Sequence, residues 1–214
     1  MNPLHCVCVA DLHGRLPEIP ACDVLIIAGD LAPDHPQFFS DPGLSRIFQE
    51  EWLMTTFAKW ETTVPAERIV MTPGNHDWFL KLPAGLRTEL YIDTTVEVAG
   101  RRFFFTPWVP PTGGKWNFEL TIKHRADQFE HIPKGLDVLV SHAPAFGVGD
   151  RAWDDERAGC RCLRTEIFEK RPRHHVFGHI HEGQREGRHF RLGQTDCWHA
   201  SMWANDWKPI RITL

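Results

Sequence analysis

Five short apolar runs, each followed at once by polar residues, constrain the fold of this 214-residue chain more than any other feature. The runs are rich in β-branched residues, which is typical of strands buried on both faces of a sheet. Ligand sites of open α/β sheets gather beyond the carboxyl ends of the strands, so these polar residues can meet in one crevice. The runs comprise residues 4–10, 24–28, 68–71, 138–140 and 174–177.

Helical candidates lie between these runs. Residues 44–60 repeat apolar side chains at the 3.6-residue spacing of an amphipathic helix. Residues 165–171 form a shorter candidate that ends before Pro172, and residues 118–129 form a weaker one. We therefore expect helices to alternate with most of the strands.

Further strands are expected outside the five runs. Residues 91–105 contain two strand-like stretches separated by Gly100-Arg101, which indicates a hairpin, and residues 188–214 also favour strands. The predicted fold class is α/β, as a four-layer α/β/β/α sandwich in preference to a Rossmann sheet. With 42% hydrophobic residues the chain can bury one sizeable core, so we expect residues 1–214 to form a single domain.

Composition narrows the choice of partners. The formal net charge of −4 and the lack of a long run of Lys or Arg disfavour binding to duplex nucleic acid or to a membrane surface. Residues 4–10 are too short for a secretory apolar segment, and no stretch approaches membrane-spanning length. We therefore expect a cytoplasmic location. The six cysteines are then expected to be reduced, and Cys160-Arg161-Cys162 lacks the spacing of a zinc site.

The polar residues at the strand ends have the chemistry of metal ligands. They supply carboxylates, imidazoles and one amide oxygen, which suit two neighbouring divalent cations. Taken singly, each short motif is as compatible with ordinary turn or strand-end chemistry, but their joint occurrence after successive strands favours a metal site. Asp11 and His13 are two residues apart, as are His179 and His181, so in extended segments each pair can share a target. The candidate ligands are Asp11, His13, Asp30, Asn75, His142, His179 and His181.

These motifs resemble the signature of the calcineurin-like metallophosphoesterases: D-x-H, G-D, G-N-H-D or E, a lone His, and G-H-x-H. All five blocks are present and in order. The resemblance implies the α/β/β/α sandwich of that family and two metal ions. It further implies that Asp30 bridges the two ions, that one of them is held by Asp11, His13 and His181, and that the other is held by Asn75, His142 and His179.

The resemblance narrows to the metallophosphoesterase-domain-containing branch, which is similar to class III cyclic nucleotide phosphodiesterases. Segments 142–144, 158–160 and 175–183 carry it, together with Thr106-Pro107-Trp108. One departure is His199-Ala200-Ser201, where the branch more often has Asn-Ala-Ser, and this puts a peripheral site contact in doubt.

A paired metal centre predicts hydrolysis of a phosphate ester. Two cations about 3.5 to 4 Å apart can share a water, lower its pKa and clamp the oxygens of an in-line displacement. The mixed nitrogen and oxygen ligands fit Mn, Fe or Zn. By resemblance His76 is not a ligand; it is placed to stabilise the transition state or to protonate the leaving oxygen, and Asp77 could orient its ring.

A small phosphate diester, possibly a nucleotide, is the favoured substrate. The stretch from Gly29 to His35 lacks the arginine-bearing block of protein phosphatases, which disfavours a phosphoprotein. Alternatives are a nuclease, a phosphomonoesterase, or a nucleotide-binding scaffold with little turnover. Aromatic residues expected near the mouth could stack on a base or simply pack in the core: Trp78, Trp108, Trp116 and Phe146.

Two long loops, residues 107–115 and 143–159, are expected near the site, because long loops in a compact domain are often functional. Within the second, the acidic residues 150–157 are compatible with a lid over the site and equally with a solvated turn.

Overall fold

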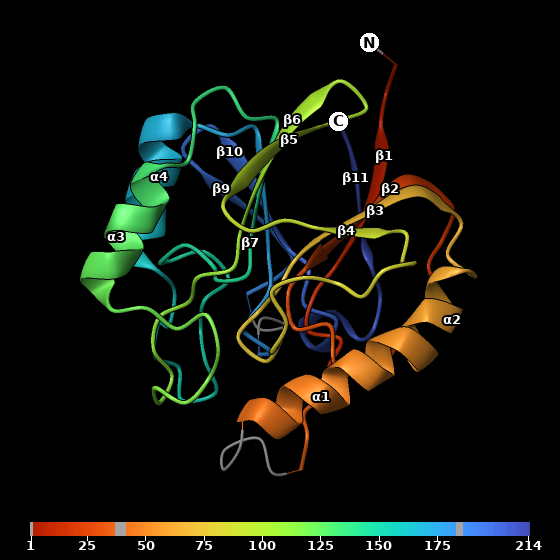
Figure 1. The fold of residues 1–214 in the computed structure, drawn as a ribbon. Helices are drawn as coiled ribbons and strands as arrows, with labels where there is room; N and C mark the ends of the chain where they lie inside the picture. The colour runs from red at the N-terminus through yellow and green to blue at the C-terminus, as the bar shows by residue number, and fades with distance from the viewer. Residues whose placement is uncertain (1, 37–41, 183–185) are drawn as a thin grey trace.

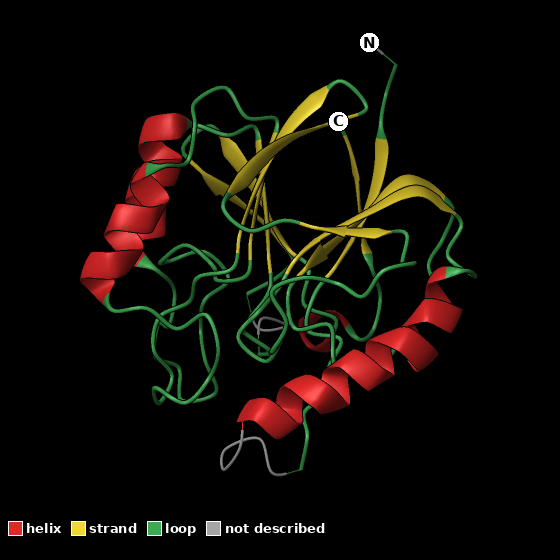
Figure 2. Ribbon diagram, in the orientation of Figure 1, coloured by secondary structure: helices red, strands yellow, loops and turns green. Residues whose placement is uncertain are grey.

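Two mixed β-sheets packed face to face, with helices on both outer faces, make up this computed structural model (Figure 1, Figure 2). The structure describes residues 2–36, 42–182 and 186–214. Each sheet contributes strands whose carboxyl ends point to the same edge of the molecule. The predicted four-layer α/β/β/α sandwich is confirmed.

The first sheet has five strands in the order β11-β1-β2-β3-β4. Strands β1 to β4 are parallel to one another and β11 pairs antiparallel with β1. Three of the predicted apolar runs form its centre, because their side chains are buried on both faces. The strands are β1 (His5–Val9), β2 (Cys22–Ala28), β3 (Ala66–Thr72), β4 (Thr88–Leu90) and β11 (Ile210–Thr213).

The second sheet has six strands in the order β5-β6-β7-β8-β10-β9. Its edge strands β5 and β9 are antiparallel to their neighbours, and the predicted hairpin is the β5–β6 pair. The other two apolar runs are β7 and β8 at its centre. The strands are β5 (Thr94–Val98), β6 (Arg101–Thr106), β7 (Val138–Ser141), β8 (His174–Phe177), β9 (His189–Leu192) and β10 (Thr195–His199).

Alternation along the strands separates the core into layers. In β1, Cys6 and Cys8 point between the sheets, whereas Val7 and Val9 point outward under the first helical layer. The inter-sheet layer is completed by residues such as Phe105 of β6. All six cysteines are unpaired, and Cys160 is buried beneath the second helical layer.

The first outer layer is one nearly continuous helical segment, as predicted for residues 44–60. It consists of α1 (Pro42–Trp52), the π-helical turn η1 (Leu53–Phe57) and α2 (Ala58–Glu61). On the other side, α3 (Ile122–Glu130) begins later than predicted, because Thr121 adopts an extended conformation and its hydroxyl accepts from the His124 amide. No helix in the described ranges is long and apolar enough to cross a membrane.

The helix predicted at residues 165–171 is longer than the sequence indicated. α4 (Arg161–Lys170) begins four residues earlier and ends where Arg171 turns left-handed, at φ 53°, before Pro172. A short 3-10 turn, η3 (Trp203–Asn205), interrupts the strands predicted in the tail.

Candidate metal centre

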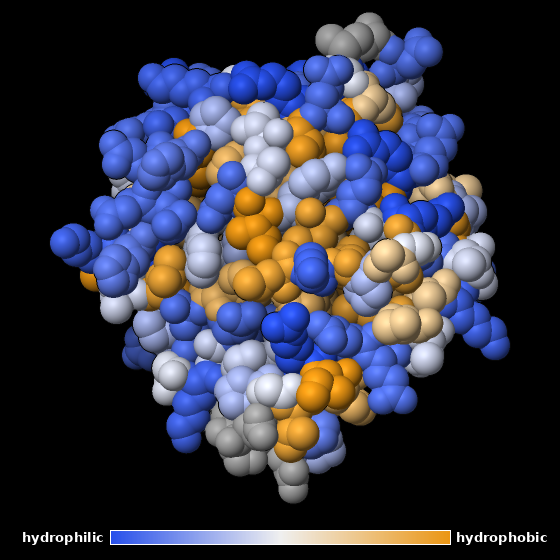
Figure 3. All heavy atoms as spheres, viewed as in Figure 1, coloured by the Kyte–Doolittle hydropathy of each residue, from blue (hydrophilic) through white to orange (hydrophobic). Residues whose placement is uncertain are grey.

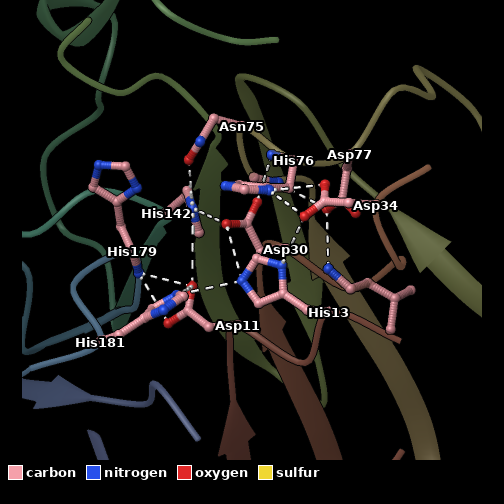
Figure 4. Close-up of polar contacts among 12 residues, drawn as sticks. Asp11, His13, Asp30, Asp34, Asn75, His76, Asp77, His142, His179 and His181 are labelled. Carbon is pink, nitrogen blue, oxygen red and sulfur yellow. Dashed lines mark hydrogen bonds and ion pairs between the residues drawn. The ribbon is translucent and has the colours of Figure 1, made fainter. Parts of the chain in front are cut away.

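The candidate ligands converge at the edge where the central strands of both sheets end (Figure 4). Ligand atoms of Asp11, His13 and His181 lie within 4.8 Å of one another, and so do those of Asp30, His142 and His179. These residues come from loops after β1, β2, β7 and β8, which are distant in sequence. His179 and His181 therefore belong to different clusters.

Asp30 lies between the two clusters. Its Oδ2 atom is 3.1 Å from His142 Nε2 and 3.8 Å from His13 Nε2. Asn75 joins the His142 side, with its Oδ1 atom 3.1 Å from His142 Nε2. One buried carboxylate oxygen is therefore within reach of nitrogen donors from both clusters, as a bridging ligand has to be.

The backbone at these residues is left-handed and not extended, which corrects one expectation. Asp11, His13, Asp30 and His179 have φ of 56°, 43°, 53° and 74°. Residues other than glycine rarely adopt this region, and such strain persists where surrounding contacts enforce it. Here the Asp11 and His13 amides donate to the carbonyls of Gly29 and Asp30. Tight turns, and not strand geometry, aim these side chains at one target.

Two glycines of the motifs lie where no side chain would fit. A Cβ at Gly29, whose φ is 94°, would lie 2.3 Å from His142 Nδ1. A Cβ at Gly74 would lie 2.2 Å from Asp30 Oδ1. Both positions let the backbone approach the ligand side chains, so glycine is part of the site and not merely of the turns.

Backbone contacts determine which nitrogen His142 presents. Its Nδ1 atom is 2.8 Å from the carbonyl oxygen of Ala28, which can only accept, so Nδ1 carries a proton. Nε2, which faces Asp30, is therefore the nitrogen available as a ligand. Burial alone would lower the pKa of His142, but the carboxylates of Asp30 and Asp11 raise it to about 9. A proton compensates these carboxylates where a cation would otherwise do so.

The other buried groups of the site have the protonation states that metal ligands need, with neutral imidazoles and an ionised carboxylate. Burial lowers the pKa of His179 to about 3 and also lowers the pKa of His13, so both rings are neutral near pH 7. Despite burial, His142 and the neighbouring histidines hold the pKa of Asp30 well below its usual value. His13 Nε2 and His181 Nε2 are 3.3 Å apart, an arrangement that needs a shared proton or a cation. The donor set thus fits divalent cations.

His76 lies beside the clusters and is oriented by Asp34. Its Nδ1 atom is 2.9 Å from both carboxylate oxygens of Asp34, and its amide donates to Asp30 Oδ1 at 2.8 Å. Burial tends to lower the pKa of His76, but the carboxylates of Asp30 and Asp34 raise it above its ordinary value. Sequence reasoning had not assigned Asp34 a role, although a carboxylate four residues after Asp30 was a usable signal.

The predicted role of Asp77 as the residue that orients His76 is wrong. Its two oxygens accept from the amides of Leu31, Ala32 and Gly74, which ties the loop after β2 to the loop after β3. Burial and the nearby charge of Asp30 raise the pKa of Asp77 to about 7, against these hydrogen bonds. Asp77 shapes the backbone of the site, and its position directly after His76 in sequence was misleading.

Gln49 of α1 is a second residue that sequence reasoning missed. This buried amide donates to the carbonyls of Pro33 and His76 at 3.1 and 2.8 Å and accepts from the Trp78 amide at 2.7 Å. It therefore fixes the loop on either side of Asp77. Nothing in the helical pattern distinguished it from a surface glutamine.

The comparisons with known proteins agree with this geometry. Residues 5–183 match the family model of the calcineurin-like phosphoesterases. The chain belongs to the calcineurin-like phosphoesterase family. Human metallophosphoesterase domain-containing protein 1 is 31% identical over 213 residues, and the match covers 83% of this chain and 60% of that protein. A UPF0046 protein of Caenorhabditis elegans is 30% identical over 217 residues and covers 83% of this chain.

The chain spans 51% and 60% of the length of these two relatives. Among solved structures, one superposes with a TM-score of 0.70 at 14% identity, covering 99% of this chain and 95% of the other. The protein TT1561 of Thermus thermophilus superposes with a TM-score of 0.57 at 10% identity, covering 99% of both chains. These structural likenesses show that the phosphoesterase fold is shared.

The aromatic residues expected near the mouth of the candidate site have different roles. Trp116 packs against the His76 ring, with centroids 3.8 Å apart. Trp78 lines a cavity of about 550 Å³ beside the site. Trp108 donates to Asp93 at 2.7 Å and packs on Phe118, so it is structural. Phe146 lies under the Arg161 guanidinium at a separate cavity.

Two remaining expectations concern the rim. His199, where the family branch more often has Asn, is buried and stacks on Phe177 with centroids 4.9 Å apart. Burial lowers the pKa of His199 to about 4. In the acidic loop, Asp150 is fully buried and accepts from the amides of Gly147 and Gly159. This carboxylate closes its own loop, which favours an internally braced turn over a lid.

Proposed function

We propose that this chain is a dinuclear-metal phosphodiesterase that acts on small organic phosphate diesters, with a nucleotide among the candidate substrates. The observation that carries the proposal is Asp30 Oδ2, which lies within 4 Å of ligand nitrogens from both clusters. In the proposed site Asp11, His13 and His181 would hold one cation, Asn75, His142 and His179 would hold the other, and Asp30 would be shared. Mn, Fe and Zn all suit these donors.

Bound cations would supply Lewis-acid activation of the attacking water and of the phosphate. The chain itself supplies the proton for the leaving oxygen. His76 is half-buried, its Nδ1 is held by Asp34, and the carboxylates of Asp30 and Asp34 raise its pKa, which favours the protonated ring. Trp116 covers one face of the ring and so restricts its motion. His76 is thus placed as a general acid.

A neighbouring cavity supports a diester over a monoester. It has a volume of about 550 Å³, its lining includes Trp78, Phe79, Leu80 and Asn117, and it can take the second organic substituent of a diester. Asn117 donates to the carbonyls of Asp77 and Asn75, which connects this cavity to the site. Hydrophobic residues are visible over α1 on the face drawn in Figure 3.

Hydrolysis of bis(p-nitrophenyl) phosphate and of p-nitrophenyl phosphate tests the proposal. Metal-stripped protein is expected to lose turnover of the diester, and added Mn is expected to restore it. Undiminished turnover after stripping would contradict the metal requirement. Turnover of the monoester alone would indicate a phosphomonoesterase, and no turnover with both metals bound would indicate a binding scaffold.

A further inference from the structure

The helices α3 and α4 lie side by side and run in the same direction (Figure 1). At their first turns Cys162 Sγ lies 3.6 Å from the Ile122 carbonyl oxygen, and at their last turns Lys170 Nζ lies 3.3 Å from the Glu130 carbonyl oxygen. Both N-termini are therefore at one end of this layer. The positive ends of two helix dipoles lie next to each other there.

A cavity of about 370 Å³ opens at this end. The first turns of both helices line it, together with residues 110–112 of one long loop and residues 157–159 of the other. Arg125, Arg157 and Arg161 are among its lining residues, and no Asp or Glu is among the described residues that line it. Its charge is opposite in sign to that of the carboxylate-rich metal centre.

Arg125 is the residue that most clearly indicates a ligand. Its side chain is buried, with 6% of the residue exposed, and its Nη1 donates to the Leu120 carbonyl. Within the described part of the chain its Nε is buried with no hydrogen-bond partner, and no carboxylate forms an ion pair with it. A buried guanidinium left without an anion is unfavourable, so an external anion would satisfy it.

The other two arginines complete the cavity in different ways. Arg157 forms ion pairs with Asp150 and Glu186, which hold it against the loop. Arg161 is exposed, and its guanidinium lies 3.7 Å from the centre of the Phe146 ring. This stacking orients the guanidinium at the start of α4, where the Cys160 side chain makes no capping hydrogen bond. Backbone amides of that turn are thus left to bind an anion.

We propose that this cavity binds a phosphate group at a site separate from the metal centre. A tetrahedral oxyanion matches the forked donors of Arg125 and Arg161 and the amides at the start of α4. The volume of the cavity also accommodates the small organic group of a phosphate ester. The phosphate comes either from a free anion that acts as an effector or from a second phosphate group of the substrate.

Calorimetric titration of inorganic phosphate into the metal-stripped 214-residue chain tests this site. Without cations, the buried carboxylates of the metal centre repel phosphate, so binding reports on the arginine cavity. We expect one phosphate per chain. Arg125→Met and Arg161→Gln are each expected to weaken binding by at least about tenfold, because hydrogen bonds to charged groups are the strong ones. Arg191→Gln, at an exposed arginine of β9, is the matched control and is expected to leave affinity unchanged.

Failure of wild-type protein to bind phosphate would overturn the proposal, as would wild-type affinity in Arg161→Gln. Arg161 is exposed, so Arg161→Gln keeps the test decisive even if Arg125→Met does not fold. The binding assay involves no turnover, and its outcome is therefore independent of whether the proposed phosphodiesterase activity is correct.

Kinetics of the metal-loaded enzyme identify the source of the phosphate. If it belongs to the substrate, Arg161→Gln raises KM at least about tenfold for a diester that carries a second phosphate, and leaves KM for bis(p-nitrophenyl) phosphate unchanged. If it is an effector, the variant abolishes only the response of activity to added phosphate at low concentration. This kinetic comparison rests on the proposed phosphodiesterase function, whereas the calorimetric one does not.

Discussion

The metal centre and the arginine cavity are two charged hollows of opposite sign, and they are built differently. The metal centre gathers buried carboxylates and imidazoles from four loops, and their charges partly compensate one another at distances of 3.1 to 4.0 Å. The arginine cavity gathers guanidinium groups at two helix N-termini, where Arg125 has no compensating carboxylate among the described residues.

The difference shows how each hollow is linked to stability. In the metal centre, the raised pKa of His142 keeps a proton beside the carboxylates of Asp30 and Asp11, which offsets part of their charge when no cation is bound. In the arginine cavity, part of the desolvation penalty of a buried cation is left uncompensated until an anion binds.

Asp30→Asn is expected to have the largest effect. The amide keeps the shape of the side chain but removes the charge shared by both clusters, so metal content falls and kcat for the diester drops by at least about 10³-fold. Elemental analysis and turnover measure the two changes. Retention of two metals with turnover within tenfold of wild type would contradict the bridging role.

His76→Gln is expected to separate chemistry from metal binding. Loss of a general acid lowers kcat by about 10²- to 10⁴-fold, while metal content stays at the wild-type level because His76 is not a proposed ligand. Substrates with better leaving groups should be affected less, because they need less protonation. An equal loss for all leaving groups would argue against proton donation.

Asp34→Asn and Asp77→Asn form a matched pair. Asp34 is remote from His76 in sequence but contacts its ring, whereas Asp77 directly follows His76 in sequence and accepts from backbone amides. Asp34→Asn is expected to lower kcat by about 10- to 100-fold, since it weakens the contact that orients His76. Asp77→Asn is expected chiefly to lower the free energy of unfolding by about 1 to 3 kcal/mol, through its three backbone amides. Urea denaturation and turnover distinguish them, and the reverse pattern would restore Asp77 as the orienting residue.

His175 is a buried histidine whose pKa is shifted by burial alone, so it measures the cost of burial without a charged partner. Burial lowers its folded pKa to about 3 from an ordinary 6.5, so below pH 6.5 the unfolded chain binds a proton that the folded chain does not. Above pH 6.5 this burial therefore does not reduce the free energy of unfolding. Between pH 6.5 and 5, His175 alone is expected to lower the free energy of unfolding by about 2 kcal/mol. His175→Gln, which can still donate to Ser141, should lose that part of the pH dependence in urea denaturation. An unchanged pH dependence would contradict the assignment.

Arg125→Met is expected to have the smallest effect on the free protein. Because it removes an uncompensated buried charge, the free energy of unfolding should stay within about 1 kcal/mol of wild type. Phosphate at ten times its Kd should stabilise wild type by about 1.4 kcal/mol and the variant much less. Thermal unfolding with and without phosphate measures both quantities, and equal stabilisation of both proteins would remove the contrast between the two hollows.

Much of the fold was predictable because burial leaves a periodic record in the sequence. The five apolar runs became central strands, and the hairpin at residues 91–105 formed as expected. The start of α3 was placed too early because its boundary depends on the extended conformation of Thr121, which local propensity does not specify. The start of α4 was placed too late for a similar reason, since residues 161–164 carry no strong helical pattern.

The site divides in the same way. The candidate ligands could be found because each motif is a short stretch at the end of a strand, and the strand order brings them together. The role of Asp34, the bracing by Gln49 and the misassignment of Asp77 could not be resolved, because sequence proximity says little about which carboxylate faces an imidazole. The arginine cavity has no local pattern at all, since its residues are far apart in the chain and meet only through the packing of α3 on α4.

Hydrophobic periodicity and short motifs at strand ends were enough to predict the layers of the sandwich, the family and the candidate metal ligands. The folded chain was needed to reveal the left-handed turns that aim the ligands, the partner of His76 and the charge left uncompensated at Arg125. These features depend on distances between segments that are remote in the chain, and such distances are fixed by packing.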